Sequence, residues 1–168
     1  MTEARYVLTS ERLGFRVFDD SDLEDLKRLD MDPEVRAQFP DGVLTASQIE
    51  KGIARSQASF RERGFADFAV FELSTGKFAG RAGFGLIESG EIEVGYVFLK
   101  EFWGRGLAQE SLRALLAWAK QNLDVPRIVA YAPKQHSASF NVMKKSGMSF
   151  FKSEIMRGVE CDMYEYPL

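Results

Sequence analysis

The segment Glu101–Glu110, with the sequence EFWGRGLAQE, combines residue types that can hold a phosphate group. It stands between a strand-like run and a long amphipathic run, so its last residues should begin a helix. The first N–H groups of a helix have no partner within the helix and carry partial positive charge. Gly104 and Gly106 let the backbone approach an anion closely, and Arg105 adds a cation. The segment predicts a diphosphate site, and the alternative is a glycine-containing loop that only begins a helix.

Two other phosphate-binding loops do not fit this segment. A P-loop requires a Gly-Lys-Ser/Thr sequence, and Leu107-Ala108 stands where the last two of these residues would be. A dinucleotide-binding loop requires a third glycine, and that position is Gln109. We also expect no parallel strand-helix-strand context for such a loop. The sequence therefore predicts neither of these two classes of nucleotide-binding protein.

Composition limits the class of protein further. The chain has 168 residues, of which 45% are hydrophobic and 28% charged, so we take 1–168 as a single domain. A net charge of −3 argues against a nucleic-acid partner. No apolar run reaches the roughly 18 residues of a membrane span, and a lone Cys161 fits a reducing cytoplasm. We expect a cytoplasmic protein with no membrane partner and, because no Cys/His cluster has ligand spacing, no metal.

Hydrophobic periodicity indicates which elements position this segment. Alternating apolar runs predict strands over 12–18, 67–73, 77–87, 91–99, 127–132, 148–156 and 159–166. Amphipathic runs with capping residues predict helices from 19–21 to about 31, from 45 to about 63, from about 106 to 122 and from about 137 to 145. Short turns between 67 and 99 favour an antiparallel meander. This order predicts an α/β (α+β) domain with helices packed on a central sheet.

Two blocks of the sequence carry a family resemblance. The run Glu91–Leu99 followed by Phe102–Ala108 resembles the acetyl-CoA motif of the GNAT N-acetyltransferases. In that family a Gln/Arg-x-x-Gly-x-Gly/Ala loop binds the cofactor diphosphate, and the chain matches it at Gly106 and Ala108, with Trp103 at the first position. The block HSASFNVMKKSGM at 136–148 is similar to a signature of the branch that acetylates ribosomal-protein N-termini. The opening Leu8–Arg16 also looks like the first strand of that branch.

The resemblance covers nearly the whole chain and implies a fold and an activity. The implied fold is that of the GNAT acyl-CoA N-acyltransferases, with a central mixed, mostly antiparallel sheet and flanking helices. The implied enzyme transfers the acetyl group of its cosubstrate acetyl-CoA directly, in a ternary complex, to a primary amine of a protein N-terminus or a small molecule. A monomer or a homodimer is expected. The alternative is a GNAT module that binds acyl-CoA as a sensor or partner domain without turning it over.

The resemblance also implies catalytic residues. A base should help, because a primary amine is largely protonated near pH 7. Glu93 is the implied base, and the alternatives are Glu91, which points to the same face of a strand, and water. Met143 stands nearest the place where many relatives have a proton-donating tyrosine. Ser139 is therefore the expected partner of the departing thiolate, or else a hydroxyl at a helix start that bonds to the backbone.

The implied cofactor contacts follow the two motifs. A backbone N–H within 97–99 is the implied oxyanion donor. Trp103 can anchor the loop by packing, Arg105 keeps a cation beside the phosphates, and Lys145 contributes to a rim for the 3′-phosphate or to a solvated helix face. His136 replaces the asparagine that contacts the pantetheine arm in relatives. The full set of cofactor-binding residues that the resemblance implies is Val97, Phe98, Leu99, Trp103, Gly104, Arg105, Gly106, Leu107, Ala108, His136, Asn141 and Lys145.

Overall fold

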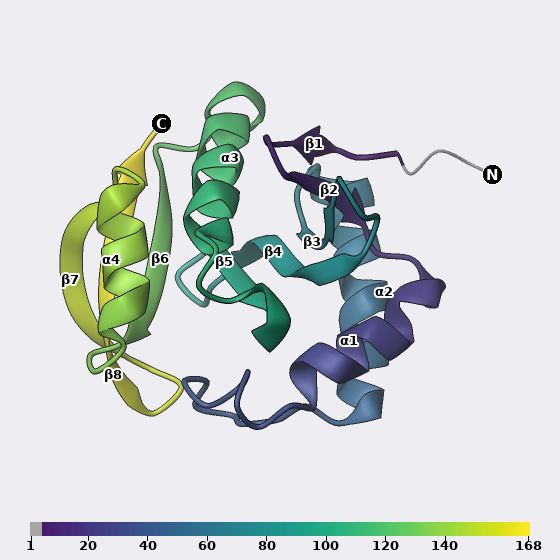
Figure 1. Ribbon diagram of the computed structural model, residues 1–168. Coiled ribbons are helices and arrows are strands. Elements are labelled where there is room, and N and C mark those ends of the chain that lie inside the picture. The colour runs from purple at the N-terminus through teal and green to yellow at the C-terminus, as the bar shows by residue number, and fades with distance from the viewer. Residues whose placement is uncertain (1–4) are drawn as a thin grey trace.

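A mixed sheet organises the chain, which the computed structural model describes over residues 5–168. In this range, eight strands lie in the order β1-β2-β3-β4-β5-β6-β8-β7 (Figure 1). They are β1 (Leu8–Thr9), β2 (Leu13–Val17), β3 (Asp67–Glu72), β4 (Phe78–Leu86), β5 (Ile92–Phe98), β6 (Arg127–Pro133), β7 (Ser149–Met156) and β8 (Val159–Pro167). The helices are α1 (Leu23–Asp30), α2 (Ala46–Arg63), α3 (Leu107–Asn122) and α4 (Ser137–Lys145), with 3-10 turns η1 (Asp20–Asp22) and η2 (Lys100–Phe102).

The sheet is mostly antiparallel. β1 to β5 are antiparallel neighbours in chain order, which confirms the predicted meander and adds the short β1 before the first predicted strand. β6 follows β5 through α3 and lies parallel to it, so the expectation that the glycine loop has no parallel strand-helix-strand context was wrong. β8 lies between β6 and β7, antiparallel to both. The parallel contact consists of one residue pair, Glu93 with Val129, whereas β4 and β5 pair from Gly80 to Leu86. β5 and β6 therefore diverge after Glu93.

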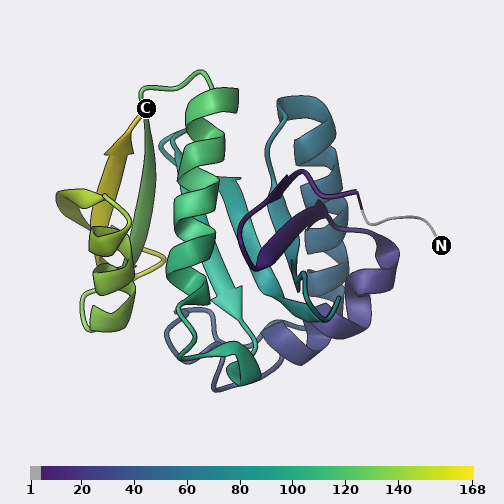
Figure 2. The ribbon, with the colours of Figure 1, turned by 45° about the horizontal axis from the view of Figure 1, so that its top comes forward.

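Helices cover both faces of the sheet (Figure 2). α1 and α2 pack together on one face, where Asp30 of α1 forms an ion pair with Arg81 of β4. α3 covers the other face, where Trp118 stacks on Phe84 of β4. Arg81 and Phe84 are three residues apart in the same strand, so their side chains point to opposite faces. α4 packs beside α3, and we call the two sides the α1–α2 face and the α3–α4 face.

The second helix begins and ends where the sequence predicts. Thr45 and Gln48 form a capping box, in which each side chain accepts a hydrogen bond from the backbone N–H of the other residue. Gly64 ends the helix with a φ of +79°, a left-handed conformation that suits glycine. Both signals are local, which is why the sequence alone contains them.

The first helix is shorter than predicted. Instead of one helix from Asp19–Ser21 to about Met31, the chain makes the 3-10 turn η1 and then α1. The buried Asp22 carboxylate accepts hydrogen bonds from the Asp19 backbone N–H and from Arg16 of β2. These bonds tie the start of the segment to the sheet, so the α-helix begins only at Leu23.

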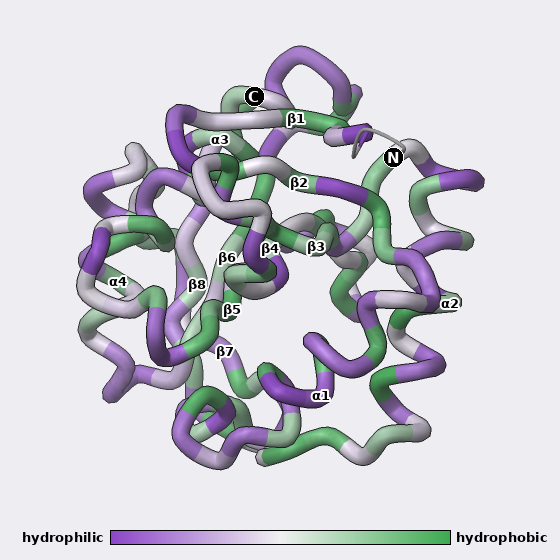
Figure 3. Tube along the Cα trace, turned by 45° about the vertical axis from the view of Figure 1, so that its right-hand side comes forward, coloured by the Kyte–Doolittle hydropathy of each residue, from purple (hydrophilic) through white to green (hydrophobic). Residues whose placement is uncertain are grey.

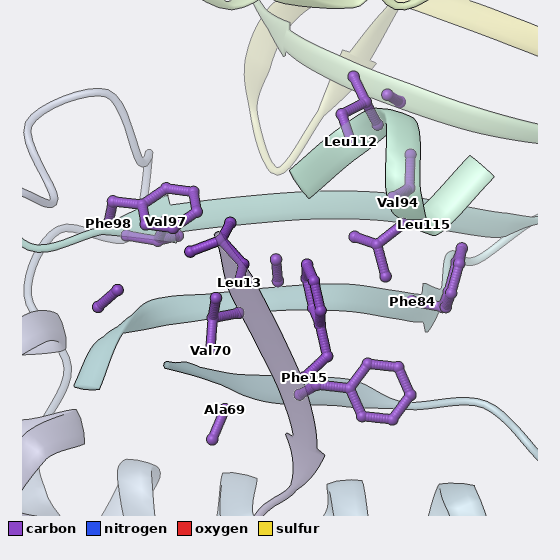
Figure 4. Close-up of a cluster of buried hydrophobic side chains, with 14 of the residues drawn as sticks. Leu13, Phe15, Ala69, Val70, Phe84, Val94, Val97, Phe98, Leu112 and Leu115 are labelled. Carbon is purple, nitrogen blue, oxygen red and sulfur yellow. The ribbon is translucent and has the colours of Figure 1, made fainter. Parts of the chain in front are cut away.

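The core holds the sheet and α3 together. On the α3–α4 face it contains fully buried side chains from β2, β3 and α3 (Figure 4), among them Leu13, Phe15, Val70, Leu112 and Leu115. Hydrophilic and hydrophobic segments alternate along α1 and α2 (Figure 3), as expected for helices with one solvated side. Burial of each large side chain contributes roughly 2 kcal/mol, so the position of α3 relative to β4 and β5 is well determined. Within residues 5–168, no helix is both long enough and apolar enough to cross a membrane.

Candidate active site

The N-terminus of α3 is open to an anion. Gly104 and Gly106 have φ values of +73° and +74°, a conformation that residues with side chains rarely adopt. The first backbone N–H groups of any helix have no partner within the helix. In α2 a side chain caps them, but α3 receives no side-chain cap from any residue in the described range, so its first N–H groups stay free. The Leu107 side chain is buried, and this residue can therefore contact a ligand only through its backbone. The loop has the geometry of an anion site.

Glu110, in the first turn of α3, ties this loop to the β1–β2 turn. Its carboxylate accepts hydrogen bonds from the Ser10 hydroxyl, the Arg12 backbone N–H and the Arg12 Nε, each at 2.7 Å. Arg12 also donates from Nη1 to the Arg105 carbonyl at 3.0 Å. A Cβ atom added to Gly106 would lie 3.8 Å from Nη2 of Arg12. Arg12 is therefore a cation beside the loop, and no sequence pattern indicates this role because its partner Glu110 lies 98 residues away.

This anchoring gives a prediction for stability. Burial opposes ionisation of Glu110, but the hydrogen bonds from Ser10 and Arg12 outweigh it and lower the pKa of Glu110. A carboxyl group with a lowered pKa in the folded state stabilises the fold above its unfolded pKa, about 4.3, and this contribution is lost as the pH falls further. We expect Glu110→Gln to lower the free energy of unfolding by about 2 kcal/mol near pH 7. Urea titrations near pH 7 and near pH 3 should show the loss shrinking on acidification.

Glu24 provides the matched control, because its carboxylate is largely exposed and forms only a surface ion pair with Lys27. Glu24→Gln should change the free energy of unfolding by less than about 0.5 kcal/mol. Equal losses in the two variants would mean that the contacts of Glu110 do not anchor the loop.

The Arg105 side chain turns toward β3. Its guanidinium forms an ion pair with Glu72 at the end of that strand and lies 5.4 Å from the ring centroid of Phe102. Hydrogen bonds from Arg105 and Thr75 lower the pKa of Glu72, so this partner stays ionised. The Arg105 side chain is 42% exposed and keeps a free surface beside the loop. Its contact with a diphosphate stays a prediction.

β5 has unpaired backbone groups where it diverges from β6. In the described part of the chain, none of residues 94–98 pairs with β6. The Leu99 N–H donates to the Ala79 carbonyl of the β3–β4 hairpin at 2.9 Å. Because backbone groups alternate in direction along a strand, the N–H of Phe98 points the other way, toward β6. Of the residues proposed as oxyanion donors, Phe98 is the one whose N–H faces the divergence, whereas that of Leu99 is already engaged.

Trp103 anchors the loop to this same point of β5. Its indole Nε1 donates to the Phe98 carbonyl at 2.9 Å. The side chain of Trp103 is half exposed, so the anchor is this hydrogen bond rather than the packing that we expected. The bond connects the glycine loop directly to the divergent end of β5.

Glu93 lies at the last paired position of β5, and its side chain points to the α1–α2 face, as does that of Arg81. Its carboxylate forms no hydrogen bond or ion pair with any residue in 5–168. Burial raises the pKa of Glu93 to about 7, and the charges of neighbouring residues change it less. A Cβ atom added to Gly95 would meet nothing within 4 Å, so there is open space beside Glu93. Glu93 can exchange a proton near neutral pH, as a general base must.

Glu91 has a different environment. Its Oε1 accepts hydrogen bonds from Nε and Nη2 of Arg127 in β6, at 2.8 and 2.6 Å. Burial opposes ionisation of Glu91, but the hydrogen bonds from Arg127 and Ser89 outweigh it and lower its pKa. Glu91 is thus a weak proton acceptor at neutral pH, and it links β5 to β6.

Residues from distant segments meet on the α1–α2 face, where the charge of Arg157 acts on the carboxyl group of Glu93. Asp41, between α1 and α2, forms an ion pair with Arg157 of the β7–β8 turn at 3.4 Å, and this turn lies beside the loop that joins the two helices (Figure 1). Burial and the charge of Glu93 raise the pKa of Tyr131 in β6. Arg157 has a φ of +50° and is the only residue other than glycine with a positive φ in the described range. No pattern in the sequence indicates these three residues, because only the fold brings them together.

The start of α4 contacts β5 on the α3–α4 face. The Ser139 hydroxyl lies 3.1 Å from the hydroxyl of Tyr96, so it bonds to a side chain of β5. His136 precedes the helix, and burial lowers its pKa. Asn141 and Lys145 are exposed on the helix. The second predicted motif therefore lies on the same face of the sheet as the glycine loop.

A shallow, open pocket of about 620 Å³ lies beside the loop, between the β1–β2 turn and the first half of α3. Arg12, Gly106 and Arg113 contribute to its lining. Arg113 also donates to the Lys145 carbonyl at 2.7 Å and so connects α3 to α4. The carboxylates of Glu11 and Glu110 line the pocket as well and balance these two cations, so the free backbone N–H groups at the start of α3 are the feature there that suits an anion.

A divergent parallel strand pair next to a glycine loop and an uncapped helix defines an acyl-CoA N-acyltransferase fold. The family model described as "Acetyltransferase (GNAT) domain" matches residues 12–149. The chain therefore belongs to the GNAT acetyltransferase family and is an acyltransferase enzyme, which confirms both the predicted fold and the predicted class.

Individual relatives and solved structures are similar to this chain over nearly its full length. An uncharacterized N-acetyltransferase of Bacillus subtilis (strain 168), YnaD, is 27% identical over 165 residues, which are 96% of this chain and 95% of the relative. An acetyltransferase structure from Agrobacterium tumefaciens str. C58 has a TM-score of 0.84 at 21% identity, covering 99% of this chain and 96% of its own. RimL, a ribosomal L7/L12 alpha-N-protein acetyltransferase solved in complex with coenzyme A, has a TM-score of 0.81 at 21% identity, covering 98% of both chains.

Proposed function

We propose that this protein transfers the acetyl group of acetyl-CoA directly to a primary amine within a ternary complex. The observation that carries the proposal is Glu93, an unpaired carboxylate with a pKa of about 7 at the point where β5 and β6 diverge. It points to the α1–α2 face, whereas the glycine loop and Ser139 belong to the α3–α4 face. The cosubstrate therefore enters from one face and the amine from the other, and they meet at the divergence.

The glycine loop before α3 binds the phosphate groups of the cosubstrate. Backbone N–H groups of residues 104–108 and the partial positive charge of α3 face the diphosphate, and Arg12 and Arg105 supply further charge. The thioester arm follows Val97–Leu99 and passes His136 and Asn141, and Lys145 lies toward the nucleotide end. The coenzyme A complex of RimL supports this assignment, because that protein shares the fold.

The residues at the divergence support the chemistry of transfer. Glu93 accepts a proton from the acceptor ammonium group, which makes the attacking amine neutral. The Phe98 N–H donates to the thioester oxygen as that oxygen gains negative charge. Ser139 donates to the departing sulfur. Each of these groups lies on, or beside, the unpaired part of β5.

The acceptor is a primary amine of a protein N-terminus or of a small molecule. The space beside Gly95 and the negative charge of Glu93 suit an unhindered ammonium group. RimL is a ribosomal L7/L12 alpha-N-protein acetyltransferase, which supports a peptide N-terminus as the first acceptor to test.

Free thiol release tests the proposal. The protein is mixed with acetyl-CoA and a panel of amines that includes N-terminal peptides, polyamines, amino sugars and amino acids. We expect thiol release that requires both acetyl-CoA and at least one amine class, and little release without an amine. If acetyl-CoA binds tightly but no amine in a broad panel raises thiol release, the protein acts instead as an acyl-CoA-binding sensor or partner domain.

A further inference from the structure

Tyr96 connects the two sides of the divergence between β5 and β6. It lies three residues after Glu93, the last residue of β5 that pairs with β6. Its side chain points to the α3–α4 face, and its hydroxyl lies 3.1 Å from the Ser139 hydroxyl in α4. Because α4 packs against β6, this hydrogen bond joins the separated strands at the level where the thioester must pass.

Either hydroxyl can be the donor in this hydrogen bond. Each hydroxyl has one proton to donate, so the pair leaves one proton for a third group. The Ser139 hydroxyl has no other hydrogen bond within residues 5–168, and the Ser139 carbonyl is 3.5 Å from the Tyr96 hydroxyl, too far for a strong bond. When Tyr96 donates to Ser139, the Ser139 proton is free. Burial raises the pKa of Tyr96, so its hydroxyl keeps its proton in the neutral range.

We propose that Tyr96 is a positioning residue that orients the Ser139 hydroxyl toward the sulfur of coenzyme A. In the proposed reaction, on which this inference rests, the carbon–sulfur bond breaks and its electron pair stays on sulfur. Tyr96 donates a hydrogen bond to the Ser139 oxygen, and the Ser139 hydroxyl donates its own to the thiolate, while the new amide nitrogen loses a proton to solvent and the thiolate takes one from solvent. The pair supplies the hydrogen bond to sulfur that the buried, apolar Met143 of the same helix cannot supply.

A purely structural hydrogen bond predicts different behaviour. If the bond only ties α4 to β5, its loss should weaken every coenzyme A analogue alike, because no contact with sulfur is lost. If the bond orients a donor, the loss should appear only for ligands that contain sulfur. Coenzyme A and desulfo-coenzyme A differ in that atom and separate the two cases without any acceptor amine.

Calorimetry with both ligands, at a pH of about 8.5 where a thiol is partly ionised, tests the proposal. We expect the wild-type protein to prefer coenzyme A over desulfo-coenzyme A. This preference should fall roughly 10- to 100-fold in Tyr96→Phe and in Ser139→Ala, the range for one hydrogen bond to a charged group. The control is Tyr164→Phe, which removes the hydroxyl of a tyrosine that stacks on Phe140 of the same helix, and it should keep the wild-type preference.

The double variant gives a second criterion. If Tyr96 acts through Ser139, Tyr96→Phe combined with Ser139→Ala should lose no more preference than either change alone, whereas independent roles would add. An unchanged preference in Tyr96→Phe, or additive losses, would overturn the inference while leaving the proposed transferase intact. Failure of the wild-type protein to bind either ligand would overturn the proposed function and this inference together.

Discussion

Glu93→Gln should lower kcat by roughly 10²- to 10⁴-fold and leave the affinity for acetyl-CoA nearly unchanged. The substitution keeps the size of the side chain and removes its ability to accept a proton. Glu93 lies on the α1–α2 face, away from the glycine loop, so no cosubstrate contact is lost. Steady-state kinetics and calorimetry on the same preparation measure the two effects separately.

The pH dependence of the rate should identify the lost group. Because burial raises the pKa of Glu93 to about 7, the wild-type rate should rise as the pH increases through that value and the carboxylate forms. The Gln variant should lack this step and should recover only toward alkaline pH, where the acceptor amine deprotonates unaided.

Stability should change in the opposite direction to activity. A carboxyl group with a raised pKa in the folded state contributes stability below its unfolded pKa, about 4.3, and loses it as the pH rises toward 7. Glu93→Gln should therefore be more stable than the wild type above pH 7, by on the order of 3–4 kcal/mol, and similar to it near pH 4.

Glu91→Gln is the matched control for Glu93. It removes a carboxylate two residues away that is held by Arg127, so it should lower stability modestly and keep kcat within a few-fold. Full activity in Glu93→Gln together with loss of activity in Glu91→Gln would show that the other carboxylate is the base. If neither change matters, water serves as the base and the site acts by positioning its two substrates.

Gly106→Val should weaken acetyl-CoA binding roughly 10- to 100-fold, because the left-handed conformation costs a β-branched residue about 1–3 kcal/mol. With a φ of +74°, Gly106 directs the chain into the open N-terminus of α3. A valine can relieve its strain only by moving the backbone N–H groups away from the diphosphate. Calorimetry on the folded variant measures the loss.

Gly64→Val separates strain from binding. Gly64 has a φ of +79° and, like Gly106, no backbone close to an added Cβ, but it ends α2 on the opposite face of the sheet. This variant should lose a comparable amount of stability and bind acetyl-CoA as the wild type does. Similar affinity losses in the two variants would mean that the effect of Gly106→Val comes from general destabilisation.

Features with local signals could be predicted from the sequence. The glycine loop is an example, because both glycines adopt the left-handed conformation that their position before a helix requires. The bounds of α2 follow from Thr45 and Gly64, which act on the backbone next to them. The strand bounds agree to within about two residues, the usual uncertainty of such boundaries.

The choice between Glu91 and Glu93 could not be made from the sequence. Both residues alternate on the same face of a strand, and neither position indicates a partner. Glu91 meets Arg127, which lies 36 residues away, and that contact removes it from consideration as a base. Glu93 has no such partner in the described residues because β6 diverges just beyond it.

The order of the C-terminal strands in the sheet could not be predicted from hydrophobic periodicity either. β8 inserts between β6 and β7, and this order brings α4 and β6 to the unpaired end of β5. The Tyr96–Ser139 bond and the Asp41–Arg157 ion pair result from that order, with partners 43 and 116 residues apart. No local pattern encodes such contacts, so half of the site follows only from the assembled fold.

Mass spectrometry of a single reaction mixture tests the central claim most directly. The protein is incubated with isotope-labelled acetyl-CoA, first alone and then with an amine that supports thiol release. The masses of the intact protein and of the small products are then measured. Direct transfer between two bound substrates predicts an unmodified protein in the first sample, and in the second a labelled amide formed in equal amount to free coenzyme A. A labelled protein that passes its acetyl group to the amine, or coenzyme A released without any labelled amide, would contradict it.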